Sequence, residues 1–262
     1  MSILDEIVAR KKNEVERVRQ SISLEKLVKS PNFKHTPISL KKALSAENSS
    51  GIIAEFKRQS PSKGIINDQV DITKVTHGYL SANVAAQSIL TDLHFFGGDV
   101  LDLIKARDVN KEKPILRKDF IVDAFQIIES KAIGADVILL IASILNEKEL
   151  LVFSKLAEDL GLEVLYEVHT EQELDKIGLL DGKIIGVNNR DLKTFKVNLE
   201  HSIELASKIP ATCIKVSESG ISDPLIVSGL KEYGFKGFLI GEHFMNSEDP
   251  GESCREFIKM IH

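Results

Sequence analysis

The chain has 262 residues and 43% of them are hydrophobic, so it can bury a large core in one or two domains. Its formal net charge of -5 excludes a global basic field that would attract nucleic acid or an anionic membrane surface. Its two cysteines, Cys213 and Cys254, lie far apart without C-x-x-C spacing, which disfavours a zinc site or a disulfide framework and favours a reducing cytoplasm.

The N-terminal segment is predicted to be helical and to lie on a larger body. Hydrophobic residues recur at helical spacing among charged residues over 2–20, which indicates an amphipathic helix. Shorter helices are expected at 24–29 and 39–46, with turns between them. The segment has no unbroken apolar stretch followed by a cleavage signature, and nowhere do about 18 apolar residues follow one another. We therefore expect neither a signal peptide nor a transmembrane helix.

From residue 51 onward, short apolar runs alternate with helical patterns. Eight strands alternating with eight helices indicate a parallel sheet, and eight is the number that closes into a barrel filled by its own side chains. We therefore predict the α/β class and a single (β/α)8 TIM-barrel domain over 1–262, with 1–48 forming an N-terminal helical extension packed on it. The strands are expected near 51–57, 85–91, 114–118, 136–141, 163–168, 184–188, 213–217 and 237–240, and the helices near 70–82, 99–107, 123–133, 147–160, 171–178, 199–207, 223–233 and 251–261.

Glycines support these boundaries, and the first loop argues against the alternative fold. Gly161, Gly178, Gly182 and Gly234 stand where helices are expected to end, because glycine readily adopts the left-handed conformation that closes a helix. An open, doubly wound sheet is the alternative. It would normally carry G-x-G-x-x-G after its first strand, whereas residues 55–64 read Glu-Phe-Lys-Arg-Gln-Ser-Pro-Ser-Lys-Gly.

Polar residues close most of the predicted strands. A strand buried in a parallel sheet should be apolar throughout, because both of its faces are covered. In a barrel, the carboxyl ends of the strands carry the loops that build the active site. A solvated loop explains any one of these residues equally well, but their coincidence at five strand ends favours an active site. The residues are Glu55 and Lys57, Lys118, Glu167, Asn188 and Arg190, and Glu218 and Ser219.

Three carboxylates and three cations would thus face one another at the barrel mouth. Glu55 and Lys57 are two residues apart, so a strand points both to the same face. Such groups shift one another's pKa values and can supply general acid–base catalysis. A lysine could instead form a Schiff base, and the sequence does not separate the two. The seven histidines show no metal-ligand spacing, so no metal is expected, and His94 and His169 are interpreted as surface residues or residues behind the site.

Glycines also follow the last two predicted strands, in Ser217–Ile221 and Leu239–Glu242. The loops after strands seven and eight of such barrels frequently bind phosphate. Glycine permits close backbone approach, and free amide groups at a helix start favour an anion. The glycines could also serve tight turns alone, but their presence after both strands favours a sugar phosphate or a similar small anion as ligand.

Seven segments around the strand ends form a specific set of motifs. They are Ile53–Gly64, Ser88–Asp92, Phe95–Gly98, Leu116–Ile121, Glu167–Thr170, Gly186–Leu192 and Ser217–Ile221. As a set they resemble the indole-3-glycerol phosphate synthase family of tryptophan biosynthesis. The resemblance covers essentially the whole chain, including the N-terminal helices.

The resemblance implies a cofactor-free ring closure by a carboxy-lyase. The substrate 1-(2-carboxyphenylamino)-1-deoxyribulose 5-phosphate would lose carbon dioxide and water and yield indole-3-glycerol phosphate. Lys118 would be the general acid that protonates the ketose carbonyl oxygen. Glu167 would act as base or acid in the dehydration, while Lys57 would share proton transfer and hold the anionic substrate. Glu55 and Glu218 would orient the lysines.

The same resemblance implies the substrate contacts. Asn188 would be one of the catalytic residues. Together with Arg190, it would hold polar groups of the substrate. Ser60 would lie near the anthranilate carboxylate or the phosphate. Backbone amides for the phosphate are expected at Ser219, Gly220, Gly241 and Glu242, and apolar walls for the aromatic ring at Phe120 and Leu139.

The sequence leaves two other functions open. Another phosphate-binding barrel, such as an isomerase of phosphoribosyl anthranilate, would need an Asp/Cys acid–base pair, and no cysteine stands at an early strand end. A non-catalytic barrel could bind a sugar phosphate, although the presence of Lys118 and Glu167 favours an enzyme. The expected partner is a small-molecule substrate, without nucleic acid or membrane, and the expected state is a monomer or weak homo-oligomer.

Overall fold

The computed structural model describes residues 2–178, 182–190 and 197–261, and within them parallel strands close into a barrel. Strand β1 pairs on one side with β4, where Ile53 faces Ala86, and on the other with β10, where Ile53 faces Leu239. Because every strand of this ring has a partner on both sides, the sheet is not open, and the predicted barrel is confirmed. The barrel strands are β1 (Ile52–Phe56), β4 (Ala86–Leu90), β5 (Ile115–Lys118), β6 (Val137–Ile141), β7 (Glu163–Val168), β8 (Ile184–Asn188), β9 (Ile214–Glu218) and β10 (Phe235–Ile240).

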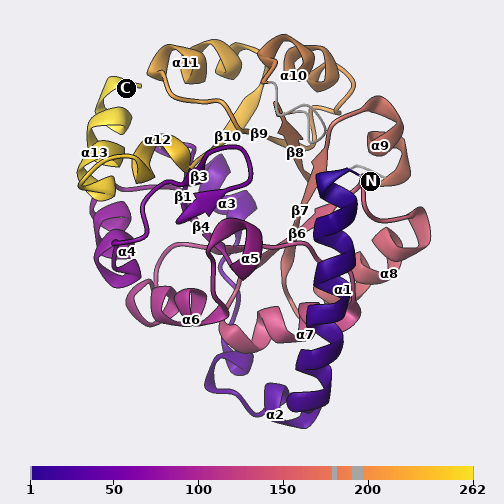
Figure 1. Ribbon diagram of the computed structural model, residues 1–262. Coiled ribbons are helices and arrows are strands. Elements are labelled where there is room, and N and C mark those ends of the chain that lie inside the picture. The colour runs from indigo at the N-terminus through magenta and orange to yellow at the C-terminus, as the bar shows by residue number, and fades with distance from the viewer. Residues whose placement is uncertain (1, 179–181, 191–196, 262) are drawn as a thin grey trace.

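A ring of helices surrounds the strands (Figure 1). Most of these helices begin with an Asp, Asn or Thr whose side chain accepts a hydrogen bond from a first-turn amide, as Asp71 and Asn146 do. Among the described residues, no helix combines the length and apolar character needed to cross a membrane. The ring consists of α4 (Ile72–Ser81), α6 (Val100–Val109), α7 (Ala124–Ile133), α8 (Glu147–Asp159), α9 (Glu171–Lys176), α10 (Leu199–Ala206), α11 (Pro224–Glu232) and α13 (Pro250–Met260).

The N-terminal helices pack on two different parts of this barrel. The long helix α1, drawn in indigo, crosses the face seen in Figure 1 beside α7, and its buried residues include Ile7, Lys11 and Val15. Helix α3 places Leu40 and Leu44 in the cluster that fills the barrel interior. The bounds are α1 (Ile3–Ser21), α2 (Leu24–Val28), η1 (Pro31–Lys34) and α3 (Leu40–Ser45); η1 is a 3-10 helix where we expected only a turn.

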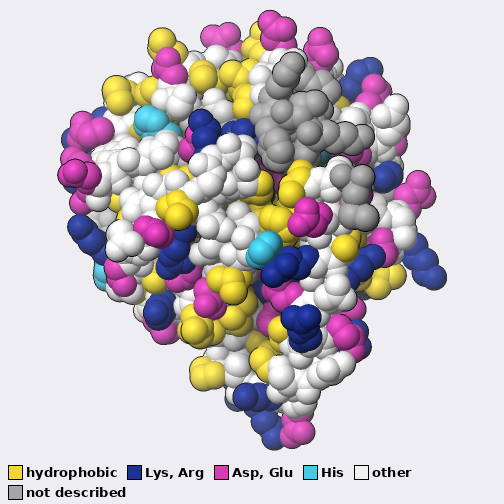
Figure 2. Space-filling view, viewed as in Figure 1, with side chains coloured by type: hydrophobic (Ala, Val, Ile, Leu, Met, Phe, Trp, Pro, Cys, Tyr) yellow, Lys and Arg dark blue, Asp and Glu magenta, His cyan; other side chains and the backbone are white. Residues whose placement is uncertain are grey.

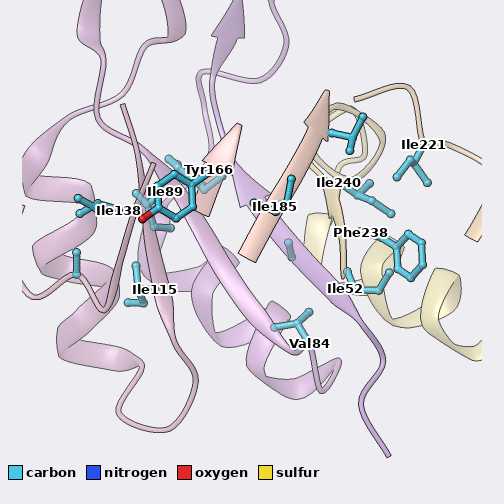
Figure 3. Close-up of a cluster of buried hydrophobic side chains, with 14 of the residues drawn as sticks. Ile52, Val84, Ile89, Ile115, Ile138, Tyr166, Ile185, Ile221, Phe238 and Ile240 are labelled. Atoms are coloured by element: carbon cyan, nitrogen blue, oxygen red, sulfur yellow. The ribbon is translucent and has the colours of Figure 1, made fainter. Parts of the chain in front are cut away.

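Alternate strand residues divide the core into two layers, as the period of two requires. On β6, Val137 and Leu139 belong to the interior cluster, whereas Ile138 and Leu140 face the helices. Figure 3 shows part of the outer layer, where Ile138 and other strand residues meet the surrounding helices. Both layers are buried, which explains why the strands read as continuous apolar runs up to their last residues.

Three short elements extend the predicted pattern on the side of the strand carboxyl ends. A small antiparallel hairpin, β2 (Gln59–Ser60) and β3 (Gly64–Ile65), follows β1. Two single-turn helices follow β4 and β10, namely α5 (Leu93–Phe96) and α12 (Glu242–Met245). Elements of two to four residues are too short to show a hydrophobic period, so the sequence did not predict them.

The predicted glycine stops are correct in three cases and wrong in one. Gly161, Gly178 and Gly234 adopt positive φ angles of 75°, 74° and 81° directly after the residues that cap α8, α9 and α11. Gly182 also has a positive φ, 66°, but it lies just before β8. Helix α9 has already ended at Lys176, so Gly182 serves the entry into a strand and does not close a helix.

Helices α4 and α13 approach closely at a pair of glycines. A Cβ atom on Gly78 would lie 2.7 Å from the Cα atom of Gly251, which is backbone and cannot rotate away. We expect Gly78→Ala to lower the free energy of unfolding by about 1–3 kcal/mol through overpacking. Gly229 is the matched control, since it also lies within a helix but a Cβ there would meet nothing within 4 Å.

We expect Gly229→Ala to raise the free energy of unfolding by about 0.4–1 kcal/mol, because alanine restricts the unfolded chain. Urea unfolding of both variants measures the two effects. If both variants changed the free energy of unfolding equally and in the same direction, the close approach of α4 and α13 would not exclude a larger residue at position 78.

Candidate active site

A cavity of about 360 Å³ opens at the carboxyl ends of the strands. Figure 2 shows the corresponding face of the molecule, where hydrophobic side chains gather around the centre. All fourteen predicted site residues line this cavity, so the structure brings together residues from seven of the eight barrel strands and the loops that follow them. They are Glu55, Lys57, Ser60, Lys118, Phe120, Leu139, Glu167, Asn188, Arg190, Glu218, Ser219, Gly220, Gly241 and Glu242.

Lys118, the last residue of β5, lies between two carboxylates. Its Nζ atom is 3.2 Å from Oε2 of Glu167 and 3.6 Å from Oε2 of Glu218. Burial alone would lower the pKa of Lys118, but the charges of Glu167, Glu218 and Glu55 raise it above its ordinary value. Lys118 is therefore an ammonium group at neutral pH and can donate a proton.

The two carboxyl groups beside Lys118 differ in charge state. Burial would raise the pKa of Glu167, but Lys118, His169 and a hydrogen bond from Nδ2 of Asn188 at 3.1 Å lower it below its ordinary value. Burial and the nearby Glu167 carboxylate raise the pKa of Glu218 to about 8, against the opposing effect of Lys118. Glu167 is therefore ionised at neutral pH, whereas Glu218 is largely protonated.

Neither carboxyl oxygen of Glu218 makes a hydrogen bond within the described part of the chain. Its side chain crosses the neighbouring strand over Gly186, where a Cβ atom would collide with Oε1 of Glu218. The carboxyl group of Glu218 can occupy this position only because residue 186, in the middle of β8, is a glycine. Because an unsatisfied buried oxygen is unfavourable, Glu218 is a natural partner for a polar group of a ligand.

A second ion pair lies across the mouth on the first strand. Lys57 Nζ is 3.1 Å from Oε1 of Glu55, as their shared face predicted. Ser88 on β4 is a further neighbour, with its hydroxyl donating to Oε2 of Glu55 at 3.4 Å. Gly241 provides the space for this pair, since a Cβ atom there would lie 2.6 Å from Oε1 of Glu55.

The loops after β9 and β10 have the form expected of an anion site. Ser219 and Gly220 adopt consecutive positive φ angles of 69° and 73°. Asn189 holds this turn, because its side-chain amide donates to the Ser219 carbonyl at 2.7 Å. Within the described residues, the backbone N–H groups of Ser219, Gly220 and Gly241 donate no backbone hydrogen bond. Arg190 lies at the same edge, with NH2 3.6 Å from Oε2 of Glu242.

The apolar wall of the cavity includes residues that the sequence did not assign to the site. Phe120 and Leu139 were predicted, and the structure adds Phe96, whose ring centroid lies 5.9 Å from that of Phe120. Ile3, Leu4 and Ile7 of α1 complete the wall. The amphipathic pattern of 2–20 signalled an apolar face but did not identify what this face covers.

Lys11 is a further residue that the sequence did not assign to the site, and it is not among the residues that line the cavity. It is 1% exposed, and its Nζ atom is 3.0 Å from a carboxylate oxygen of Asp92 and 3.0 Å from one of Asp119. Asp119 directly follows Lys118 in the chain and also pairs with Arg117. This buried charge network fastens α1 to the ends of β4 and β5.

The two histidines singled out from the sequence occupy different environments. His94 is exposed, as expected, whereas His169 is largely buried behind Glu167. In the part of the chain that the structure describes, no three His, Cys, Asp or Glu side chains are arranged to hold a metal ion. Asp191 and Leu192, which complete one of the motifs, lie outside the described residues.

Solved structures share the fold at low sequence identity. Tryptophan synthase subunit alpha from Legionella pneumophila matches with a TM-score of 0.61 and 13% identity, covering 85% of this chain and 96% of that one. A 3-hexulose-6-phosphate synthase matches with a TM-score of 0.60 and 14% identity, covering 80% and 99%. At such identities the likeness establishes the barrel fold alone.

The sequence comparisons are far more specific. The family model described as indole-3-glycerol phosphate synthase matches residues 4–257. A protein of that name from Bacteroides thetaiotaomicron is 47% identical, covering 99% of this chain and 98% of its own. Another from Acetivibrio thermocellus is 45% identical, covering 97% and 98%. The chain therefore belongs to the indole-3-glycerol phosphate synthase family, the carboxy-lyases of tryptophan biosynthesis.

Proposed function

We propose that the cavity at the barrel mouth closes the indole ring of 1-(2-carboxyphenylamino)-1-deoxyribulose 5-phosphate, with Lys118 as the general acid. The observation that carries this proposal is the position of Lys118, whose ammonium group lies within 3.6 Å of both Glu167 and Glu218 at the centre of the cavity. A proton donor flanked by one ionised and one protonated carboxyl group suits a reaction that moves several protons in sequence.

The first step forms the carbon–carbon bond. The aromatic carbon that carries the carboxylate attacks the ketose carbonyl carbon, while the carbonyl oxygen takes a proton from Lys118. Holding both reacting atoms in contact provides a large part of the acceleration, because the reaction is intramolecular. Substrate that enters between Lys118 and the two carboxyl groups would weaken the pairing that raises the Lys118 pKa, which makes the proton easier to release.

The second and third steps remove carbon dioxide and water. The bond to the carboxylate carbon breaks, and its electron pair restores the aromatic ring as carbon dioxide leaves. The new hydroxyl group then takes a proton and leaves as water, while the neighbouring CH2 group loses a proton. We assign Glu167 to this dehydration as base or acid, with Lys57 sharing the proton transfer and with Glu55 and Glu218 orienting the lysines. Two protons enter and one leaves, so each turnover consumes one proton without external oxidant or reductant.

The ends of the substrate would be held by different parts of the cavity. The phosphate fits the loops after β9 and β10, where Ser219, Gly220 and Gly241 line the cavity together with Glu242, the first residue of α12. The aromatic ring fits between Phe120 and Leu139. We further assign Asn188 and Arg190 to polar groups of the substrate, and Ser60 to the anthranilate carboxylate or the phosphate.

We also propose the setting in which this site works. The site binds a small-molecule substrate, and the protein binds neither nucleic acid nor membranes. The extension over 1–48 and the barrel act as one domain, and the protein is a cytoplasmic monomer or weak homo-oligomer. Light scattering coupled to size-exclusion chromatography over a range of concentrations tests the oligomeric state, and a stable large assembly would contradict it.

The direct test of the function is the fluorescence of the indole product. Purified protein is mixed with the carboxyphenylamino-deoxyribulose phosphate in the presence of a metal chelator, and turnover is expected. A folded protein that binds the substrate without turnover would instead be a sugar-phosphate-binding barrel, and the proposed reaction would be wrong.

The role of Glu167 is tested by Glu167→Gln, which keeps the shape of the side chain and removes its charge. We expect kcat to fall by about 10²- to 10⁴-fold with a smaller change in KM, because proton transfer is lost and the contacts of the substrate remain. Glu171→Gln, an exposed change four residues further along, is the matched control and should leave kcat unchanged. Full activity of a folded Glu167→Gln variant would remove Glu167 from the mechanism.

A further inference from the structure

His169 lies two residues beyond Glu167, at the point where β7 turns into α9. Its side chain is 14% exposed, and each of its ring nitrogens faces a carboxylate. Nε2 is 3.8 Å from Oε1 of Glu167, and Nδ1 is 3.4 Å from Oε2 of Glu173. The imidazole therefore bridges a carboxylate of the cavity and a carboxylate in the first turn of α9.

The turn between β7 and α9 fixes this arrangement. The backbone N–H of His169 donates to Oε2 of Glu173 at 2.6 Å, and the backbone N–H of Glu173 donates to the hydroxyl of Thr170 at 3.1 Å. Glu173 is thus held at both its backbone and its carboxylate. Because the same carboxylate also faces Nδ1, its position determines where the ring points and keeps Nε2 directed toward Glu167.

The charges around the imidazole favour its protonated form. Glu167 and Glu218 face it from β7 and β9, and Glu173 faces it from α9. Lys118 from β5 lies on the far side of Glu167, and Lys176 of α9 lies near Glu173. Burial alone would lower the pKa of His169, but the hydrogen bond with Glu173 and the charges of Glu167, Glu173 and Glu218 raise it above its ordinary value.

We infer that His169, in its protonated form and oriented by Glu173, is a positioning residue that holds the Glu167 carboxylate in its working place beside Lys118. Among the described residues, Lys118 and Asn188 then contact the Glu167 carboxylate by hydrogen bonds and His169 by charge. The inference rests on the proposed role of Glu167 in the dehydration. It assigns His169 no proton transfer to the substrate.

The sign of the pH dependence follows from the raised pKa. The positive charge of His169 is present at low pH and is lost as the pH rises through that pKa. Loss of the charge raises the pKa of Glu167, because His169 is one of the groups that lower it. Removing His169 should therefore move the acid limb of the kcat/KM profile, where Glu167 gains a proton, to higher pH.

The first experiment measures the titration of His169 itself. NMR titration of the histidine ring nitrogens is expected to give His169 a pKa above about 6.5, the ordinary value. The Glu173→Gln and Glu167→Gln variants should each lower that pKa, since each removes one of the carboxylates that raise it. A His169 pKa at or below the ordinary value in the wild type, or one that neither variant changes, would overturn the inference.

The second experiment measures catalysis. His169→Gln can still place a hydrogen-bond donor near Glu167 but has no charge, and we expect its kcat to fall by about 10- to 100-fold through misplacement of Glu167. Its acid limb should move to higher pH. His77→Gln, an exposed change on α4, is the matched control. An active His169→Gln variant with an unshifted acid limb would overturn the inference.

These outcomes are separable from a failure of the proposed function. If Glu167→Gln retained full turnover, the role of Glu167 would be wrong, whatever the titration of His169 showed. If Glu167→Gln were inactive while His169 titrated ordinarily, the proposed function would stand and the positioning role of His169 would be wrong.

Discussion

Replacing Lys118 by methionine is expected to reduce kcat by about 10²- to 10⁴-fold, with a much smaller change in KM. Methionine keeps most of the length of the side chain but has no proton to give to the carbonyl oxygen. The fold should survive, because burial and the Glu167 carboxylate raise the pKa of Glu218 to about 8, and the Glu167 carboxylate keeps its hydrogen bond from Asn188. Steady-state kinetics measures the loss, and circular dichroism checks the fold.

Lys236→Met is the matched control for this experiment. Lys236 is also a strand lysine, but it lies near the amino end of β10 and is exposed, far from the chemistry. We expect its kcat to equal that of the wild type. A folded Lys118→Met variant that retained more than about a tenth of the wild-type kcat would rule out Lys118 as the general acid.

Asp136→Asn is expected to lower the free energy of unfolding by about 3–5 kcal/mol. Asp136 is fully buried just before β6, and its carboxylate is surrounded by donors. His35 and the backbone N–H of Ile38 contact Oδ1, at 2.9 and 2.8 Å, while Arg107 and the backbone N–H of Ile115 contact Oδ2. An amide has only one acceptor atom, so one pair of donors would face an NH2 group.

Urea unfolding measures this loss, with Asp108→Asn as its control. Asp108 is exposed and pairs only with Lys111 at 3.8 Å among the described side chains, so its replacement should change the free energy of unfolding by less than about 0.5 kcal/mol. Since Asp136 joins residues 35–38 to the barrel, the variant should also loosen the N-terminal extension. Similar stabilities for the two variants would show that this carboxylate does not hold the extension on the barrel.

The barrel and the position of its mouth could be predicted because both depend on local patterns. Strands buried on both faces are continuously apolar, so Lys118, Glu167 and Glu218 stand out as polar residues at their ends. The parallel register then brings these ends together: Glu167 is paired with Gly186 and Asn188 with Glu218 on neighbouring strands. The roles of these residues came from the family resemblance, since strand ends alone do not distinguish an acid from a Schiff-base lysine.

The rest could not be predicted because it depends on contacts distant in sequence. The amphipathic pattern of α1 specifies an apolar face but not its partner, so the contribution of Ile7 to the cavity was not foreseen. Lys11 was unremarkable in a charged helix, although it is buried and pairs with two carboxylates from other elements. His169 was expected at the surface or behind the site, and its orientation toward Glu167 depends on the turn that Glu173 closes.

Gly186 has a consequence for how the protein tolerates mutation. It has no functional group, yet any other amino acid there brings a Cβ atom into the space occupied by the Glu218 carboxyl group. Every missense change of a glycine codon introduces a Cβ, so genetic drift offers no neutral exchange at this position. A saturation library selected for growth without tryptophan should therefore reject substitutions at Gly186 as strictly as at a catalytic residue. A position that tolerates no substitution can therefore mark space that a catalytic side chain must occupy, and not only a residue that takes part in the reaction.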